Sequence, residues 1–272
     1  MHPEIEFSLF GAVLTVKSYA LFTVLAALTG VLTALPLLRR EGLRAKQTAP
    51  LIALMAAAFL IGARLLNAAV NPDAYGESLR LFSLRLAGLS LYGGIFGALG
   101  MLLLWARLTK RNPLPLLDAL VLPSGLGFAL ARVGCYLNGC CAGIPTNSVW
   151  GVRFPSHGGE ETALGGIFSL LGKNSIAAFV YPTQLFEMGL ALLGLVPVLW
   201  LYFRRKLPPG GAFLIYGIWF SAMRLMILPL RSLPYPEPVV RWVYPLLYLV
   251  LIAAGLLLLR RAYQKAETIR KN

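Results

Sequence analysis

Charged residues are scarce in this chain. Lysine, arginine, aspartate and glutamate make up 13% of its 272 residues, against about a quarter in soluble domains. This shortage argues against a soluble fold, because 58% of the residues are hydrophobic and the mean hydropathy is +0.71. We therefore expect lipid to be the solvent. The formal net charge of +14 is then an orientation signal rather than a nucleic-acid-binding surface.

Histidine and cysteine are also rare. The chain has two histidines and three cysteines, namely His2, His157, Cys135, Cys140 and Cys141. Three cysteines do not make a disulfide framework. Two histidines offer few ligands for a metal, so we predict neither a metal nor a cofactor. The first residues also lack a basic stretch, so we expect no cleavable signal peptide.

Long apolar runs are abundant. They cover residues 18–38, 50–71, 88–106, 115–133, 182–203, 210–229 and 240–259. Each can form a helix that crosses a hydrocarbon core of about 30 Å. We predict an all-α integral membrane protein of about seven transmembrane helices that forms one membrane domain over residues 1–272. Residues 134–181, between helices 4 and 5, would form a small extracytoplasmic head.

Basic residues cluster in alternate connections between these helices. They are Arg39, Arg40, Arg44 and Lys46, then Arg107, Lys110 and Arg111, then Arg204, Arg205 and Lys206, and finally Arg260, Arg261, Lys265, Arg270 and Lys271 in the tail. Basic loops stay on the cytoplasmic side of a membrane. The pattern therefore predicts an extracytoplasmic N-terminus and a cytoplasmic C-terminus.

The third run carries glycines at a spacing suited to close helix contact. They are Gly93, Gly94, Gly97 and Gly100. Small residues allow two membrane helices to approach closely. We expect this face to pack against another helix rather than to bind a ligand.

Four ionisable side chains fall in the outer half of the predicted helices. They are Arg64, Arg132, Glu187 and Arg224, with Tyr19, Tyr92, Asn138 and Gln184 at similar depth. Ionisable groups at membrane depth are costly and therefore indicate function. Three arginines against one glutamate leave a positive excess that suits a lipid phosphate. The alternatives are that the arginines reach for the interface or pair with Glu187, and that Tyr19 and Tyr92 belong to an aromatic belt.

Residues 131–143 read Ala-Arg-Val-Gly-Cys-Tyr-Leu-Asn-Gly-Cys-Cys-Ala-Gly. They resemble the signature Gly-Arg-x-Gly-Asn-x-x-Asn-Gly-x-x-x-Gly of the prolipoprotein diacylglyceryl transferase family. Residues 59–64, 89–94, 181–187 and 211–224 resemble other motifs of that family in the same order. The resemblance thus covers nearly the whole chain.

The resemblance implies transfer of the diacylglyceryl group of phosphatidylglycerol to the thiol of a prolipoprotein cysteine, in a bacterial inner membrane. It makes Arg132, Arg224 and Tyr92 the catalytic candidates, the two arginines as ligands of the phosphate. The substrate-binding candidates are Arg64, Asn138, Gly143, Gln184, Glu187 and Tyr19. The expected partners are phosphatidylglycerol or another anionic phospholipid, and a prolipoprotein or related acceptor, with no nucleic acid. The alternative is a phospholipid-binding or lipid-translocating protein without catalysis.

Several positions depart from the family pattern. Tyr92 and Tyr181 stand where the family has histidines, and Cys135 stands where it has an asparagine. Phe220 and Leu228 replace a tyrosine and a glutamate. A phenol with a pKa near 10 is a poor base at neutral pH, so no general base is identified, and His157 is one hypothesis. The cysteines allow a disulfide between Cys135 and one of the other two, or a covalent nucleophile.

Overall fold

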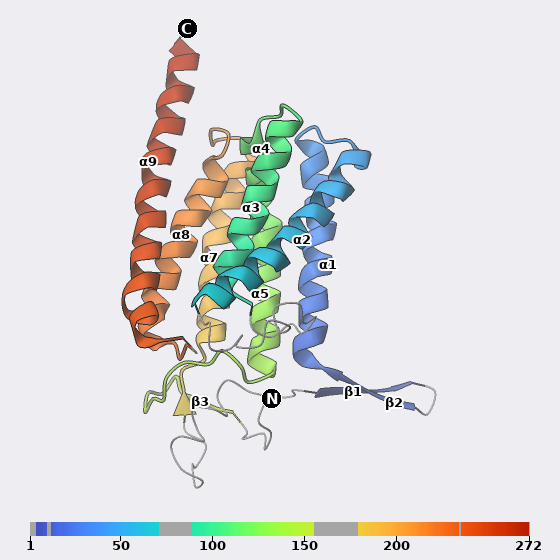
Figure 1. Cartoon of the computed structure of the whole chain (residues 1–272), viewed down its shortest axis with the longest axis vertical. Helices are drawn as coiled ribbons and strands as arrows, with labels where there is room; N and C mark the ends of the chain where they lie inside the picture. The colour runs from blue at the N-terminus through green and yellow to red at the C-terminus, as the bar shows by residue number, and fades with distance from the viewer. Residues whose placement is uncertain (1–3, 10–11, 71–88, 155–178, 234, 272) are drawn as a thin grey trace.

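The computed structural model describes residues 4–9, 12–70, 89–154, 179–233 and 235–271. This part of the chain contains seven helical spans long and apolar enough to cross a membrane. The spans form one bundle (Figure 1). Large apolar side chains such as Leu32, Val196 and Leu246 are more than half exposed on its surface. A surface of this kind suits lipid, so the predicted all-α membrane protein of about seven spans is confirmed.

The spans follow one another with short connections wherever the chain is described. They are α1 (Ser18–Arg40), α2 (Ala45–Val70), α3 (Leu91–Leu108), α4 (Pro113–Ala119) with α5 (Val121–Leu137), α7 (Thr183–Phe203), α8 (Gly211–Ile227) and α9 (Tyr244–Lys271). The 3-10 turn η3 (Leu228–Leu230) ends the sixth span, and the π-helical turn η4 (Val239–Val243) begins the seventh. The predicted runs therefore lie within a few residues of the observed helices, except at the end of α9.

Helix α9 continues well past the predicted limit at residue 259. Its last turns contain alanine, glutamine, lysine, glutamate and arginine, which are strong helix formers in water. Hydropathy marks only the part of a helix that is apolar, so it missed this extension. In Figure 1 the C-terminal turns rise beyond the rest of the bundle.

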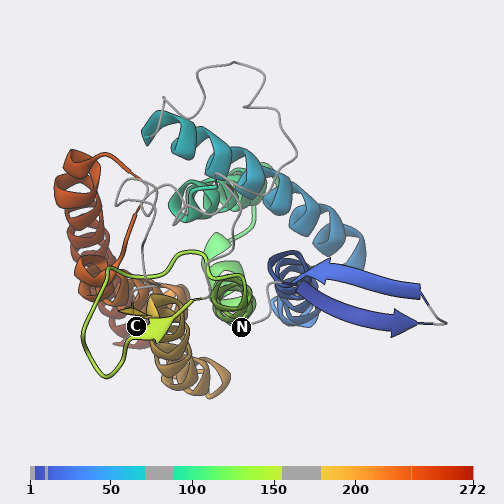
Figure 2. The same ribbon diagram turned by 90° about the horizontal axis from the view of Figure 1, so that it is seen from below.

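The N-terminal residues form a hairpin that the sequence did not predict. Strand β1 (Glu4–Leu9) pairs antiparallel with β2 (Ala12–Lys17), and Glu4 lies opposite Lys17. Opposite charges on facing strand positions favour this register. The hairpin leads directly into α1 and projects sideways from the bundle (Figures 1 and 2).

The fourth span is the most buried of the seven and is interrupted once. Helix α4 ends at Ala119, and α5 begins after Leu120. Pro123 has no N–H to donate to the carbonyl of Ala119, so the regular ladder is broken there. Helix α5 then carries Arg132 through the middle of the bundle, towards the end opposite the chain's C-terminus.

Helices α2 and α3 pack through the predicted glycine face. A Cβ added to Gly93 would lie 2.2 Å from the carbonyl oxygen of Gly62, and one added to Gly97 would lie 2.2 Å from that of Ala58. A Cβ added to Gly94 would lie 2.5 Å from the ring of Phe59 in α2. Around Gly100, in contrast, there is open space. The packing prediction is thus confirmed for three of the four glycines and wrong for Gly100.

Only parts of the predicted head, residues 134–181, are described. The chain from 138 to 154 crosses beneath the helix ends on the side of the N-terminus (Figure 2). Strand β3 (Val152–Arg153) pairs antiparallel with β4 (Phe179–Val180), just before α7. Residues 155–178 lie outside the described residues. The head and the single domain over residues 1–272 therefore stay predictions.

Candidate active site

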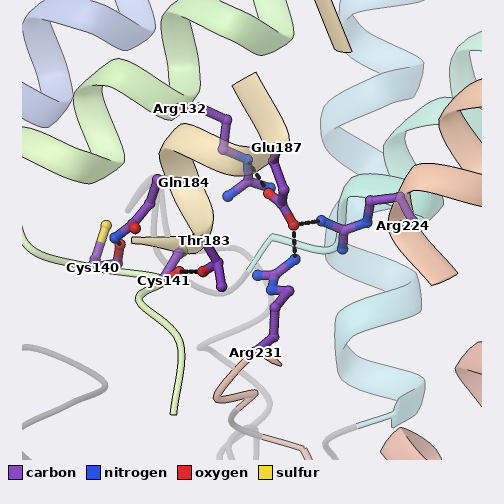
Figure 3. A network of polar contacts seen from close by, with 8 residues as sticks. All are labelled: Arg132, Cys140, Cys141, Thr183, Gln184, Glu187, Arg224 and Arg231. Carbon is purple, nitrogen blue, oxygen red and sulfur yellow. Dashed lines mark hydrogen bonds and ion pairs between the residues drawn. The ribbon is translucent and has the colours of Figure 1, made fainter. Parts of the chain in front are cut away.

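Three guanidinium groups from separate elements converge on one carboxylate, that of Glu187 in the second turn of α7 (Figure 3). The Nε atom of Arg132, from α5, lies 2.7 Å from Oε2 of Glu187. Nη1 of Arg231, just after η3, lies 2.9 Å from Oε1, and Arg224 of α8 donates to the same oxygen. The site thus links the ends of three helices.

The cluster is almost fully buried. The exposed fraction is 1% for the side chain of Glu187 and 11% for that of Arg132. Arg224 and Arg231 are each 7% exposed. Three positive charges against one negative charge leave two positive charges in a poorly hydrated place. Buried charge of this kind is costly unless a counter-ion is present.

Several buried polar atoms around this cluster lack a hydrogen-bond partner among the described residues. They are Nε of Arg224, Nε of Arg231, the hydroxyls of Tyr92 and Tyr248, and Oε1 of Gln184. Four of these five atoms can donate a hydrogen bond. Unpaired buried donors beside an excess of positive charge are the arrangement that an anion with several oxygens would complete.

The start of α7 holds the turn that follows α5. Nε2 of Gln184 donates to the carbonyl oxygen of Cys140 at 2.7 Å, and the Thr183 hydroxyl donates to that of Cys141 at 3.0 Å (Figure 3). Both donors are completely buried. These bonds fix the cysteine turn within one helical turn of Glu187.

The cysteines of this turn differ in acidity. Hydrogen bonds from Cys135 and Cys140, helped by the nearby guanidinium groups of Arg132 and Arg231, hold the pKa of the Cys141 thiol well below its usual value. A hydrogen bond from Cys135 lowers the pKa of Cys140, but hydrogen bonding with Cys141 and burial outweigh it and raise that pKa to about 11. In the described structure all three are free cysteines, not the disulfide that the sequence suggested.

Other predicted site residues lie around the same centre. The Asn138 side chain, at the end of α5, is hydrogen bonded to Cys140. Tyr19, at the start of α1, lies within electrostatic reach of the three cysteines. Tyr92 is buried against Tyr248, with ring centroids 5.4 Å apart, and lies within electrostatic reach of Arg224.

Gly143 and Arg64 lie differently. Gly143 forms a bridge with Arg231, and a Cβ there would come within 2.3 Å of the carbonyl oxygen of Leu230. At Gly143 the backbone of the cysteine turn therefore passes close to the backbone at Leu230, and this contact positions Arg231. Arg64 is half-buried on α2 and does not belong to the group of ion pairs on Glu187. His157 lies outside the described residues.

Arg231 is the site residue that sequence reasoning missed. The motifs and apolar runs of the sequence give this arginine no role. A signal was present, because positive-inside patterning leaves few basic residues on the extracytoplasmic side. An arginine directly after an outer helix end is therefore unusual enough to mark as a candidate.

The sequence is similar to known proteins over most of its length. The model of the prolipoprotein diacylglyceryl transferase family matches residues 5–260. The chain is 32% identical to a phosphatidylglycerol–prolipoprotein diacylglyceryl transferase of Photorhabdus laumondii over 204 residues, which are 71% of this chain and 68% of that protein. A protein of the same name from Bifidobacterium adolescentis is 28% identical over 80% of this chain and 66% of its own length.

Other alignments are shorter. The protein of that name from Yersinia enterocolitica is 31% identical over 160 residues, which are 55% of this chain and 53% of its own length. The matched region therefore spans about half the length of that relative. The match of the family model over nearly all of the sequence decides the assignment: the chain belongs to the prolipoprotein diacylglyceryl transferase family.

Proposed function

We propose that this protein transfers the diacylglyceryl group of phosphatidylglycerol to the thiol of a cysteine in a prolipoprotein. The observation that carries the proposal is the buried positive excess formed by Arg132, Arg224 and Arg231 around Glu187. A phosphodiester brings one negative charge and several acceptor oxygens. It would offset the charge and pair with the free donors of Arg224 and Arg231.

The chemistry follows from where negative charge develops. The acceptor sulfur attacks the glyceryl carbon, the bond from that carbon to the phosphate oxygen breaks, and glycerol phosphate leaves with an additional negative charge. Fixed guanidinium groups in a buried site stabilise that charge more strongly than water does. Arg132 and Arg224 therefore act on the transition state, and Arg231 joins them. Glu187 fixes the positions of the three guanidinium groups and is therefore a positioning residue.

The remaining candidates fall into secondary roles. Tyr92 would donate its free hydroxyl to the lipid head group instead of acting as a base. Gln184, Asn138 and Tyr19 would shape the acceptor side, because they lie at the cysteine turn. Arg64 would meet the lipid further along its path into the bundle.

We also propose the orientation of the protein in a bacterial inner membrane. The site lies at the end of the bundle opposite the C-terminal helix end (Figure 1). Basic residues cluster at the connections near the other end, which favours a cytoplasmic C-terminus. The site would then open towards the extracytoplasmic face, where a prolipoprotein is exposed after export.

The test uses purified full-length protein in nanodiscs that contain phosphatidylglycerol, with a peptide that carries the acceptor cysteine. Mass spectrometry of the peptide measures the gain of a diacylglyceryl group. Arg132→Ala or Arg224→Ala should lower the rate by roughly 100- to 1,000-fold, as loss of one fixed donor to a transition-state anion does. Arg241→Ala is the matched control, because that side chain is exposed and pairs only loosely with Glu237 at 3.6 Å.

Thermal unfolding of each variant shows that it is folded. Full activity in a folded Arg132→Ala or Arg224→Ala protein would reject the proposed site. If the wild-type protein retained bound phosphatidylglycerol but modified no peptide, it would be the non-catalytic lipid-binding protein that the substitution of histidine by Tyr92 allows.

A further inference from the structure

The proposed function leaves a cluster of three thiols without a role. The sulfur atoms of Cys135, Cys140 and Cys141 all lie within 4.8 Å of one another. They account for every cysteine in the sequence. The cluster lies beside the charged site, because the Cys141 thiol is within electrostatic reach of Arg132 and Arg231.

The end of α5 explains why these side chains meet. Gly139 has a φ of +72°, the Cys140 N–H donates to the carbonyl of Cys135, and the Gly139 N–H donates to that of Tyr136. This is the Schellman pattern of a helix end, in which the residue after the glycine packs onto the third residue from the helix end. Here both residues are cysteines. Cys141 also has a positive φ, of 60°, an unusual conformation for a non-glycine residue and one often found at functional sites.

The cluster is held from outside as well. The bonds from Gln184 and Thr183 to the carbonyls of Cys140 and Cys141 fix the backbone on which two of the thiols stand. The Asn138 side chain is hydrogen bonded to Cys140. A ligand set supported in this way is pre-organised, as outer groups orient the inner ligands of metal sites.

The dimensions and chemistry of the cluster suit zinc. In a tetrahedral zinc site with Zn–S bonds of about 2.3 Å, the sulfur atoms are roughly 3.8 Å apart, within the range seen here. Thiolates are soft ligands that select zinc over magnesium or calcium. Three protein ligands are also the number found at catalytic zinc sites, where the fourth position stays open for a reactant.

Charge favours the same ion. Three thiolates and one Zn²⁺ carry a net negative charge of one, and the neighbouring arginine–glutamate cluster carries two positive charges. The two groups therefore attract each other. Arg132 and Arg231 are both within electrostatic reach of the Cys141 thiol.

We propose that Cys135, Cys140 and Cys141 bind one Zn²⁺ and that the acceptor thiol is its fourth ligand. The second half of this proposal rests on the proposed function. On binding, the acceptor thiol loses its proton to solvent, since a zinc-bound thiol is deprotonated. Its sulfur then attacks the glyceryl carbon, a C–S bond forms, the C–O bond to phosphate breaks, and glycerol phosphate leaves. The zinc ion remains Zn²⁺ throughout, and no oxidant or reductant is needed.

This arrangement accounts for the missing base. Tyr92 stands where the family has a histidine, and a phenol does not deprotonate a thiol efficiently near neutral pH. A metal ion supplies the thiolate without a base. A covalent intermediate on one of the three cysteines is excluded on chemical grounds, because its displacement would break a thioether, and an alkyl thiolate is a far poorer leaving group than a phosphate ester.

The first measurement is metal content. Full-length protein without a histidine tag is purified in reductant, loaded with zinc, dialysed and measured by mass spectrometry of its metals. We expect stoichiometric zinc in the wild type. Cys140→Ser and Cys141→Ser should weaken binding by more than the roughly 10- to 100-fold that loss of an outer-shell partner costs. Asn147→Ala, an exposed change in the same loop, is the control and should bind like the wild type.

The second measurement needs no variant and remains decisive if the serine variants misfold. Cobalt replaces zinc, and its visible spectrum reports a tetrahedral thiolate site. Adding the cysteine peptide should change the spectrum as the fourth ligand is exchanged, whereas the same peptide with serine should not change it. Removing the metal with a chelator should abolish transfer, and added zinc should restore it.

The outcomes separate the two proposals. The zinc site is supported if zinc binds at stoichiometry and the cobalt spectrum responds to the thiol peptide. If the same protein transfers no lipid, only the proposed function fails. Transfer at full rate by metal-free protein or by the serine variants overturns the zinc proposal and leaves the function intact. A wild-type protein that binds no zinc after complete reduction, or that holds a disulfide within the cluster and stays active, also overturns it.

Discussion

At the scale of single residues, Glu187 has the most partners in the site. It is 1% exposed and forms ion pairs with three arginines. Without it, three guanidinium groups would face one another in a poorly hydrated place. Removal of one partner of a buried ion pair is more harmful than replacement of the whole pair by apolar groups.

Glu187→Gln is therefore expected to destabilise the protein by about 3–5 kcal/mol. Thermal unfolding in detergent measures the change. Glu237→Gln is the matched control, because Glu237 is exposed and forms a loose pair with Arg241, and surface changes of this kind cost within about 0.5 kcal/mol. Equal melting temperatures for the two variants would contradict the role given to Glu187. Added phosphatidylglycerol should stabilise the Glu187→Gln variant more than the wild type, because the lipid phosphate would offset the positive charge that Glu187 no longer balances.

The residues of the site also show the limit of sequence reasoning. Arg132, Arg224 and Glu187 could be recognised because ionisable groups at membrane depth are rare. Arg231 lies just beyond a helix, where depth gives no signal, and Gly143 acts through the crossing with the chain at Leu230. Partners of that kind depend on loop paths, which periodicity does not determine.

At the scale of helices, α2 and α3 pack closely at glycine positions. Gly97 of α3 faces the carbonyl of Ala58, whereas Gly100, one turn later, faces open space. The pair offers a matched comparison on one helix.

Gly97→Ala should cost about 1–3 kcal/mol, because the added methyl group would overlap backbone that cannot move without separating the helices. Gly100→Ala should be neutral or stabilise the protein by up to about 1 kcal/mol, since alanine favours the helix. Thermal unfolding of both variants in the same detergent provides the comparison. A destabilisation of similar size in both would mean that the glycines matter for flexibility rather than for packing.

A second connection between helices lies far from the site. Asp118 in α4 accepts hydrogen bonds from the backbone N–H groups of Gly210 at 2.7 Å and Phe213 at 2.9 Å, at the start of α8. The first turn of a helix leaves its N–H groups without partners, and a carboxylate satisfies them. Asp118 thus has a structural role, and α8 is held in place at one end while it presents Arg224 at the other.

At the scale of the whole molecule, the proposed orientation rests on the distribution of basic residues. We expect a fluorescent protein fused to the C-terminus to fluoresce, because that end should lie in the cytoplasm. Alkaline phosphatase fused at the same point should be inactive there, and active when fused at the N-terminus. The reverse pattern would place the candidate site on the cytoplasmic side and remove its access to an exported acceptor.

The number, order and approximate ends of the spans were predictable from the sequence, as was the family. Each depends on local hydropathy or on motifs carried by one segment. The hairpin at the N-terminus and the extension of α9 were not predictable in this way, because neither is marked by a long apolar run.

The meeting of the charged and thiol groups could not be predicted from local pattern. Arg132, Glu187 and Arg224 come from three helices that are far apart in sequence, and their shared contact depends on how those helices rotate as they pack. The three sulfur atoms are close in sequence, yet only the left-handed turn at Gly139 and Cys141 brings them together. The sequence by itself thus determined that the chain is embedded in a membrane and which ionisable residues lie at membrane depth, where burying a charge costs free energy. The tertiary structure decided which of them share one site, because rotation and turn geometry arise from packing over the whole bundle.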